Sequence, residues 1–145
     1  IAEVKKPYIV MHMRGNPQNM QSKASYSNVA NEVIKELSET TRTLAIKGVN
    51  DVIIDPGFGF SKTLNQNYML LDNLESLQTL DRPILIGVSR KSMIYNLLKN
   101  KPENALNGTT AINTIALLKG ANILRVHDVK EAFEITQIIN AMKAK

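Results

Sequence analysis

Asp55 is the residue around which a ligand site can be built. It follows residues 52–54, three β-branched residues that predict a strand buried on both faces, as in a parallel sheet. Pro56 and two glycines then end the strand and let the backbone turn, while Phe58 and Phe60 add two rings. A fixed carboxylate offers two coplanar acceptors to a flat ring edge with adjacent N–H donors. In the plainer alternative, Asp55 caps a turn and both rings only pack the loop.

Cationic side chains follow two later strands. Lys91 lies just past the third predicted strand, where it could meet the opposite, carbonyl-bearing edge of such a ring. Arg125 and His127 are two residues apart on the last predicted strand, so their side chains point the same way. A buried strand tolerates an arginine only where an anion satisfies it, which predicts a phosphate or diphosphate. The alternatives are structural ion pairs, Asp55 with Lys91 and Arg125 with Asp55 or Asp128.

Three further positions complete the candidate groups. Ser89 and Arg90 open a predicted helix, where a hydroxyl, backbone N–H groups and the helix dipole suit a carboxylate, although Ser89 is equally suited to be an N-cap. Met11, like Phe60, could supply an apolar face for a ring or simply pack the core. The chain has no Cys and two His, and no nucleophile–His–acid arrangement or transition-metal cluster is predicted. These groups would position and polarise a substrate.

Four strand–helix pairs hold these residues. Strands are predicted at residues 7–12, 51–55, 83–88 and 122–127. Helices are predicted at about residues 27–47, 65–78, 93–98 and 109–119. Asp128 is the predicted N-cap of a last helix, and Glu131 stands at capping-box spacing from it.

Alternating strands and helices predict right-handed crossovers and a parallel sheet. An open doubly wound sheet and half of a (β/α)8 barrel both fit this order. In an open sheet only the strand ends at the switch point carry ligand groups, whereas all strand ends of a barrel face one mouth. All four strand ends here carry polar or ligand-sized groups, which favours an α/β TIM barrel. A complete barrel needs about 250 residues, so residues 1–145 are expected to be its C-terminal half, the last four β/α units, without the N-terminal half.

The composition excludes several other classes. The chain is 43% hydrophobic and 21% charged, and no apolar run approaches the ~20 residues that span a bilayer. Without cysteines or a signal-peptide pattern, a cytoplasmic protein with no membrane partner is expected. The net charge is +5, but Lys and Arg are scattered and aromatics make up only 5%, so nucleic-acid binding is not expected.

Four segments in this order resemble the dihydropteroate synthase family. They are residues 11–17 (Met-His-Met-Arg-Gly-Asn-Pro), 55–60 (Asp-Pro-Gly-Phe-Gly-Phe), 87–92 (Gly-Val-Ser-Arg-Lys-Ser) and 125–128 (Arg-Val-His-Asp). No single segment is specific, but their joint occurrence at barrel spacing is. The resemblance implies a TIM-barrel transferase of folate biosynthesis. It condenses 6-hydroxymethyl-7,8-dihydropterin diphosphate with 4-aminobenzoate to give 7,8-dihydropteroate and diphosphate, and sulfonamides compete with the aminobenzoate.

The same resemblance implies a role for each candidate residue. Asp55 and Lys91 would be catalytic and bind the pterin together with Met11 and Gly87. Phe60, Ser89 and Arg90 would bind 4-aminobenzoate, and Arg125 and His127 the diphosphate. Mg²⁺ would accompany the diphosphate, with no metal ligand in this half, and the full-length protein would be a homodimer. The missing strands carry Asn and Asp groups that complete the site, so this half alone is expected to be inactive, with exposed strand edges.

Two other functions fit parts of the pattern. A pterin-binding domain that passes a methyl group from methyltetrahydrofolate to a corrinoid shares the barrel and the carboxylate at the pterin edge. Residues 89–91 and 125–127 argue against it, because methyl transfer releases no diphosphate. A half-barrel that binds pterin or phosphate without turnover is the third possibility.

Overall fold

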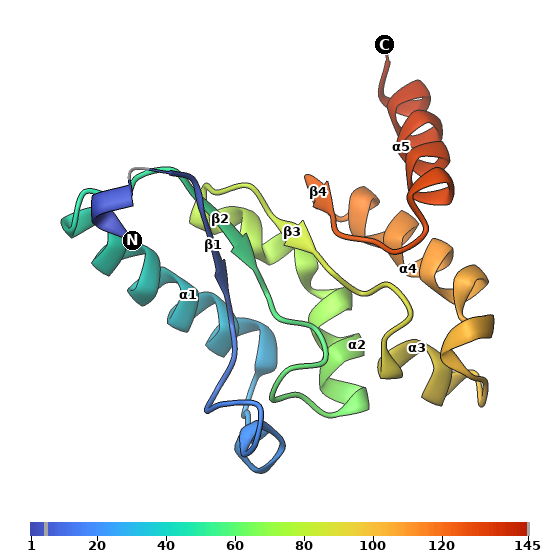
Figure 1. The fold of residues 1–145 in the computed structure, drawn as a ribbon, viewed down its shortest axis with the longest axis horizontal. Helices are drawn as coiled ribbons and strands as arrows, with labels where there is room; N and C mark the ends of the chain where they lie inside the picture. Colours follow the sequence, from blue (N-terminus) through green and yellow to red (C-terminus); the bar gives the residue numbers. More distant parts are fainter. Residues whose placement is uncertain (5, 145) are drawn as a thin grey trace.

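The computed structural model describes residues 1–4 and 6–144, which are arranged as Figure 1 shows. Its strands are β1 (Tyr8–Met11), β2 (Val52–Asp55), β3 (Leu85–Ile86) and β4 (Ile123–Leu124). β1 pairs with β2 and β3 with β4, both in parallel, and a parallel bridge between Ile54 and Ile84 joins the two pairs.

Each strand lies beside the next one along the chain, and this order does not reverse within the described residues. An open doubly wound sheet would reverse its order at a switch point, next to the ligand. Consecutive parallel strands with a helix in every connection form instead one sector of a (β/α)8 barrel. This confirms the predicted fold class.

The helices follow one another around one side of the strands (Figure 1). They are α1 (Val29–Ile46), α2 (Leu64–Asp72), α3 (Ser92–Leu97), α4 (Leu106–Leu118) and α5 (Val129–Lys143). Short 3-10 helices are η1 (Ala2–Val4), η2 (Met20–Lys23), η3 (Leu74–Leu80) and η4 (Pro102–Asn104). Side chains set two of the N-termini: Asn28 accepts from the Asn31 amide, and Thr63 forms a capping box with Gln66.

The single helix predicted at residues 65–78 is wrong in its second half. α2 ends at Asp72, and the chain continues as η3. In a 3-10 helix residues i and i+3 lie on the same side. Leu74 and Leu77 therefore reach the core together, and both are completely buried. Burial of these two leucines outweighs continuation of the α-helix.

The predicted strands at residues 83–88 and 122–127 are much longer than the observed β3 and β4 because side chains replace the ladder at both ends. The Asn122 side chain accepts from the Ile84 amide at 2.9 Å. At the other end the Ser89 hydroxyl accepts from the His127 amide at 3.2 Å. The last ladder bond runs from the Arg125 amide to the Ile86 carbonyl at 2.8 Å.

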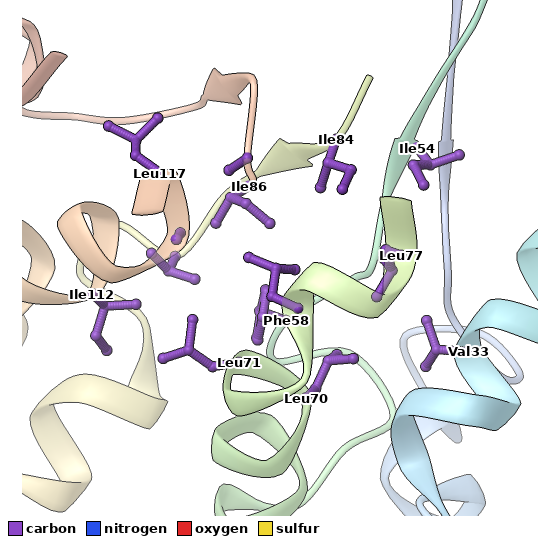
Figure 2. Packing of buried hydrophobic residues seen from close by; sticks show 14 of the residues in the cluster. Val33, Ile54, Phe58, Leu70, Leu71, Leu77, Ile84, Ile86, Ile112 and Leu117 are labelled. Carbon is purple, nitrogen blue, oxygen red and sulfur yellow. The ribbon is translucent and has the colours of Figure 1, made fainter. Parts of the chain in front are cut away.

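The core lies between the strands and the helices, and Figure 2 shows its centre. Ile54, Ile84 and Ile86 from the strands face Val33 of α1 and Leu70 of α2. Phe58, from the loop after β2, is completely buried in the same cluster. Burying such a side chain contributes roughly 1.5–3 kcal/mol, so Phe58 fixes this loop to the core.

Gly57 lets the loop after β2 cross the end of β1. Its φ is +69°, and a Cβ atom there would collide with the backbone carbonyl oxygen of His12. Gly48, between α1 and β2, also has a positive φ, +81°, but a Cβ atom there would meet no other atom within 4 Å. Both glycines are thus required by a left-handed backbone, but only Gly57 is also required by close packing.

We predict that Gly57→Ala destabilises the protein more than Gly48→Ala does. Gly48→Ala should lower the free energy of unfolding by about 1–2 kcal/mol, the cost of placing an alanine in the left-handed region. Gly57→Ala must in addition move the loop away from His12. The measurement is urea unfolding of both variants at natural full length. Equal losses of unfolding free energy would contradict the close approach.

Candidate functional site

Asp55 ends β2 opposite Met11 of β1, its partner in the parallel register. Its side chain is 2% exposed. One carboxylate oxygen, Oδ1, accepts from the Gly57 amide at 2.8 Å, and the other, Oδ2, lies 3.3 Å from Nη2 of Arg125. The loop that follows the strand therefore holds the carboxylate, and an arginine from the end of β4 occupies its open side.

Burial raises the pKa of Asp55, while the Gly57 amide and the positive charges of Arg125, Lys91 and Lys62 work in the opposite direction. The net shift is upward, so these groups do not fully compensate for the lost water. A ligand that brings N–H donors to the open side would stabilise the ionised form. A desolvated carboxylate among cations at a strand end is typical of a binding site.

Lys91, at the N-cap position of α3, contacts the same loop. Its Nζ donates to the Phe58 carbonyl at 2.5 Å and lies 4.5 Å from the ring centroid of Phe60. Burial lowers the pKa of Lys91, and the negative charge of Asp55 opposes this shift. Lys91 is thus a partly desolvated cation held against the carboxylate loop rather than an extended surface side chain.

Arg125 and His127 converge on a small cavity, as the strand spacing predicts. The cavity has a volume of about 170 Å³ and is lined by Gly87, Ser89, Lys91, Arg125, Val126 and His127. Arg125 crosses directly over Gly87, where a Cβ atom would lie 2.8 Å from its Nη2. The Arg125 side chain remains 55% exposed, so it can bind an anion that enters from solvent.

Ser89 is engaged by His127 instead of standing free at a helix terminus. Its hydroxyl accepts from the His127 amide and lies 3.0 Å from the ring Nδ1. Ser89 precedes α3 by three residues, and Lys91 is the residue at the N-cap position. The alternative of an N-cap Ser89 is therefore wrong, because its hydroxyl is used to hold the histidine ring at the cavity.

Arg90 points away from this cavity. Its Nε and Nη2 donate to both oxygens of Asp128 at 2.9 and 2.8 Å, and its Nη1 donates to the carbonyls of Pro102 and Glu103. The expected contact with 4-aminobenzoate does not fit these partners, because all three guanidinium nitrogens are occupied. The same pair corrects the predicted cap of α5: the Asp128 side chain makes no capping hydrogen bond, since its carboxylate binds Arg90.

A second polar cluster lies behind the Asp55 loop and was missed in the sequence. Lys62, 3% exposed, donates from Nζ to Nδ1 of His12 at 3.0 Å. The other ring nitrogen of His12 lies 3.0 Å from Glu36 of α1, which also binds Arg14. The sequence feature that could have indicated this cluster is Lys62 itself, a lysine at the end of the Gly-rich segment that follows a buried strand. Periodicity does not reveal that its ammonium turns inward.

Among the described residues no group of three or more His, Asp or Glu side chains could hold a metal ion. The helices in the described ranges also include none with the length and apolar character required to cross a membrane.

The chain is similar to known proteins in both sequence and structure. A family profile described as "Pterin binding enzyme" matches residues 1–127. The chain therefore belongs to the pterin-binding enzyme family. It is 42% identical to dihydropteroate synthase of Escherichia coli (strain K12) over 142 residues, which make up 97% of this chain and 50% of that protein.

Solved structures give the same result. The Yersinia pestis dihydropteroate synthase with a sulfonamide drug complex has a TM-score of 0.94 and 38% identity, covering 99% of this chain and 53% of its own. The Thermus thermophilus dihydropteroate synthase, in complex with 4-aminobenzoate or with 6HMPPP, has a TM-score of 0.94 and 36% identity, covering 99% of this chain and 59% or 58% of its own. The chain spans about half the length of these relatives.

The resemblance implies that Arg90 binds 4-aminobenzoate; we predict instead that Arg90→Ala lowers the melting temperature and leaves any affinity for that ligand unchanged. The substitution removes the bonds that tie the start of α3 to Asp128 and η4, but no group of the cavity. Thermal unfolding and calorimetric titration of the full-length protein provide the measurements. Arg42→Ala, at an exposed position of α1, is the control. A selective loss of 4-aminobenzoate affinity in Arg90→Ala would restore the sequence-based role.

Proposed function

We propose that this chain contributes the pterin and diphosphate binding groups of a dihydropteroate synthase. The observation that supports it best is the buried carboxylate of Asp55 beside a cavity with Arg125 and His127 in its wall. Such a pair of sites suits a ring with N–H donors joined to a diphosphate, as in 6-hydroxymethyl-7,8-dihydropterin diphosphate. The Thermus thermophilus relative binds 6HMPPP and 4-aminobenzoate, which agrees with this substrate pair.

In the proposed complex the pterin edge replaces Arg125 at Asp55. The Arg125–Asp55 contact of 3.3 Å is long for a charge-assisted hydrogen bond, and Arg125 is half exposed. Two ring N–H donors can satisfy the carboxylate better than one distant guanidinium nitrogen. Arg125 is then released toward the diphosphate of the same substrate. Met11, in register with Asp55, and Gly87, under Arg125, would line the ring.

The proposed reaction joins the amine nitrogen of 4-aminobenzoate to the exocyclic methylene carbon of the pterin. The bond from that carbon to the diphosphate oxygen breaks, diphosphate leaves with the electron pair, and the amine loses a proton. Positive charge develops on the pterin and negative charge on the leaving group. Asp55 would stabilise the first, and Arg125 and His127 the second, so positioning and electrostatics supply the catalysis. Lys91 would contact the pterin carbonyl edge.

For 4-aminobenzoate we propose contact with Phe60, whose ring Lys91 already covers from one side. Ser89 would act by holding His127, since its hydroxyl is engaged there. Mg²⁺ would accompany the diphosphate. The groups around the cavity are cationic or neutral, whereas Mg²⁺ prefers oxygen ligands, so we assign it no ligand among the described residues.

Self-association belongs to the same proposal. Large apolar side chains are exposed on the two C-terminal helices: Ile115, Leu118, Val129, Phe133, Ile138 and Met142. Such a surface favours a protein contact, and a homodimer of the full-length protein is the simplest form of it. A cytoplasmic location is proposed from the folate-pathway role.

The test is calorimetric titration of the protein at natural full length with 6-hydroxymethyl-7,8-dihydropterin diphosphate, followed by diphosphate release on addition of 4-aminobenzoate. Binding with turnover is expected. Methyltetrahydrofolate binding that is indifferent to diphosphate would favour the methyltransferase, and binding without turnover would favour a non-catalytic protein.

We predict that Arg125→Ala weakens the pterin diphosphate by roughly 10- to 100-fold, the equivalent of one or two charged hydrogen bonds. Affinity for the free 6-hydroxymethylpterin ring should stay the same or rise, because Arg125 no longer competes for Asp55. Lys130→Ala, an exposed lysine of α5, is the control. Equal losses for both ligands would contradict the assignment of Arg125 to the diphosphate.

A further inference from the structure

Lys62 is a buried cation that no step of the proposed reaction uses. Its ammonium group has three donors, and three acceptors surround it: His12 Nδ1 at 3.0 Å, the Gly57 carbonyl at 3.1 Å and the Phe60 carbonyl at 3.1 Å. Burial is the main cause that lowers its pKa to about 7. Placing a lysine here therefore costs free energy compared with an apolar side chain.

The cluster continues to the outer helix. Because Lys62 donates to Nδ1, the proton of a neutral His12 lies on Nε2, which donates to Glu36 Oε2 at 3.0 Å. Burial, followed by the charge of Lys62, lowers the pKa of His12 to about 4, in agreement with a neutral ring. Arg14 holds Glu36 from the far side and stacks 3.9 Å from the ring centroid of Tyr26.

Gly57 connects this cluster to the binding carboxylate. Its amide donates to Asp55 Oδ1 at 2.8 Å, while its carbonyl accepts from Lys62 at 3.1 Å. The peptide groups on the two sides of Gly57 thus bind the carboxylate and the buried ammonium. Lys91 holds the Phe58 carbonyl of the same loop from the side of the cavity. A shift of Lys62 would turn Gly57 and with it the acceptor plane of Asp55.

We propose that Lys62, His12 and Glu36 form a positioning relay that fixes the orientation of the Asp55 carboxylate toward the pterin edge. This inference rests on the proposed function, because the pterin is the ligand whose binding would depend on this orientation. The relay touches neither substrate in the proposed complex. It acts through Gly57, in the way that supporting hydrogen bonds orient ligating groups in other sites.

The experiment compares Lys62→Met, His12→Leu and His12→Gln in the full-length protein. Lys62→Met keeps the length of the side chain and removes its donors. His12→Gln keeps an acceptor toward Lys62 and a donor toward Glu36, whereas His12→Leu keeps neither. Lys119→Met is the control, since Lys119 pairs with Asp72 and Glu75 in a separate surface cluster. The readouts are the dissociation constant for 6-hydroxymethyl-7,8-dihydropterin and the amide proton shift of Gly57.

Lys62→Met and His12→Leu are expected to weaken dihydropterin binding by about 10- to 100-fold and to move the Gly57 amide proton upfield as its bond to Asp55 loosens. His12→Gln and Lys119→Met should match the wild type in both readouts. If Lys62→Met does not fold, the two His12 variants decide the question.

Folded Lys62→Met with unchanged dihydropterin affinity and an unchanged Gly57 shift would overturn the proposal. Equal losses in His12→Leu and His12→Gln would overturn it as well, since a purely steric role predicts that result. Failure of the wild type to bind dihydropterin would refute the proposed function, while the Gly57 shift would still report whether Lys62 sets the carboxylate.

Discussion

The site depends on one constraint, the burial of the Asp55 carboxylate at the end of β2. A carboxylate that is 2% exposed loses almost all contact with water, and the structure compensates with one amide and several cations. The compensation is incomplete, as the raised pKa shows. Folding alone would favour a neutral residue at this position. The carboxylate is therefore best explained by a ligand that completes its hydrogen bonds.

The cations around this carboxylate come from different parts of the chain. Lys62 lies in the loop between β2 and α2, Lys91 at the start of α3, and Arg125 just after β4. Together they exceed the charge of Asp55, so the mouth of the sector is electropositive. Such a field attracts an anionic substrate and stabilises an anionic leaving group. Under the proposed function, this field would let a cavity of about 170 Å³ bind a diphosphate without a metal ligand of its own.

Among the described residues, Ser61, Asp81, Arg90 and Lys99 have a positive φ without being glycine, and the first and third of them lie in loops beside the site. Ser61 and Arg90 have φ values of +47° and +54°, in the loops that follow β2 and β3. Both are held by hydrogen bonds: the Ser61 hydroxyl accepts from the Arg14 amide at 2.9 Å, and Arg90 binds Asp128. Left-handed residues other than glycine cost of order 1–3 kcal/mol each. For Ser61 and Arg90, the hydrogen bonds to Arg14 and Asp128 offset part of this cost.

The sequence by itself determined the strand–helix order, the barrel fold and the convergence of Asp55, Lys91, Arg125 and His127, because hydrophobic periodicity and strand direction depend on near neighbours. It did not determine which partner each charge takes. Arg90 binds Asp128 across 38 residues, Lys62 binds His12 across 50, and Arg125 binds Asp55 across 70. These choices depend on how the ends of separate β/α units meet in space. Only the tertiary structure therefore decided that Arg90 supports the fold and that Lys62 stands behind the carboxylate.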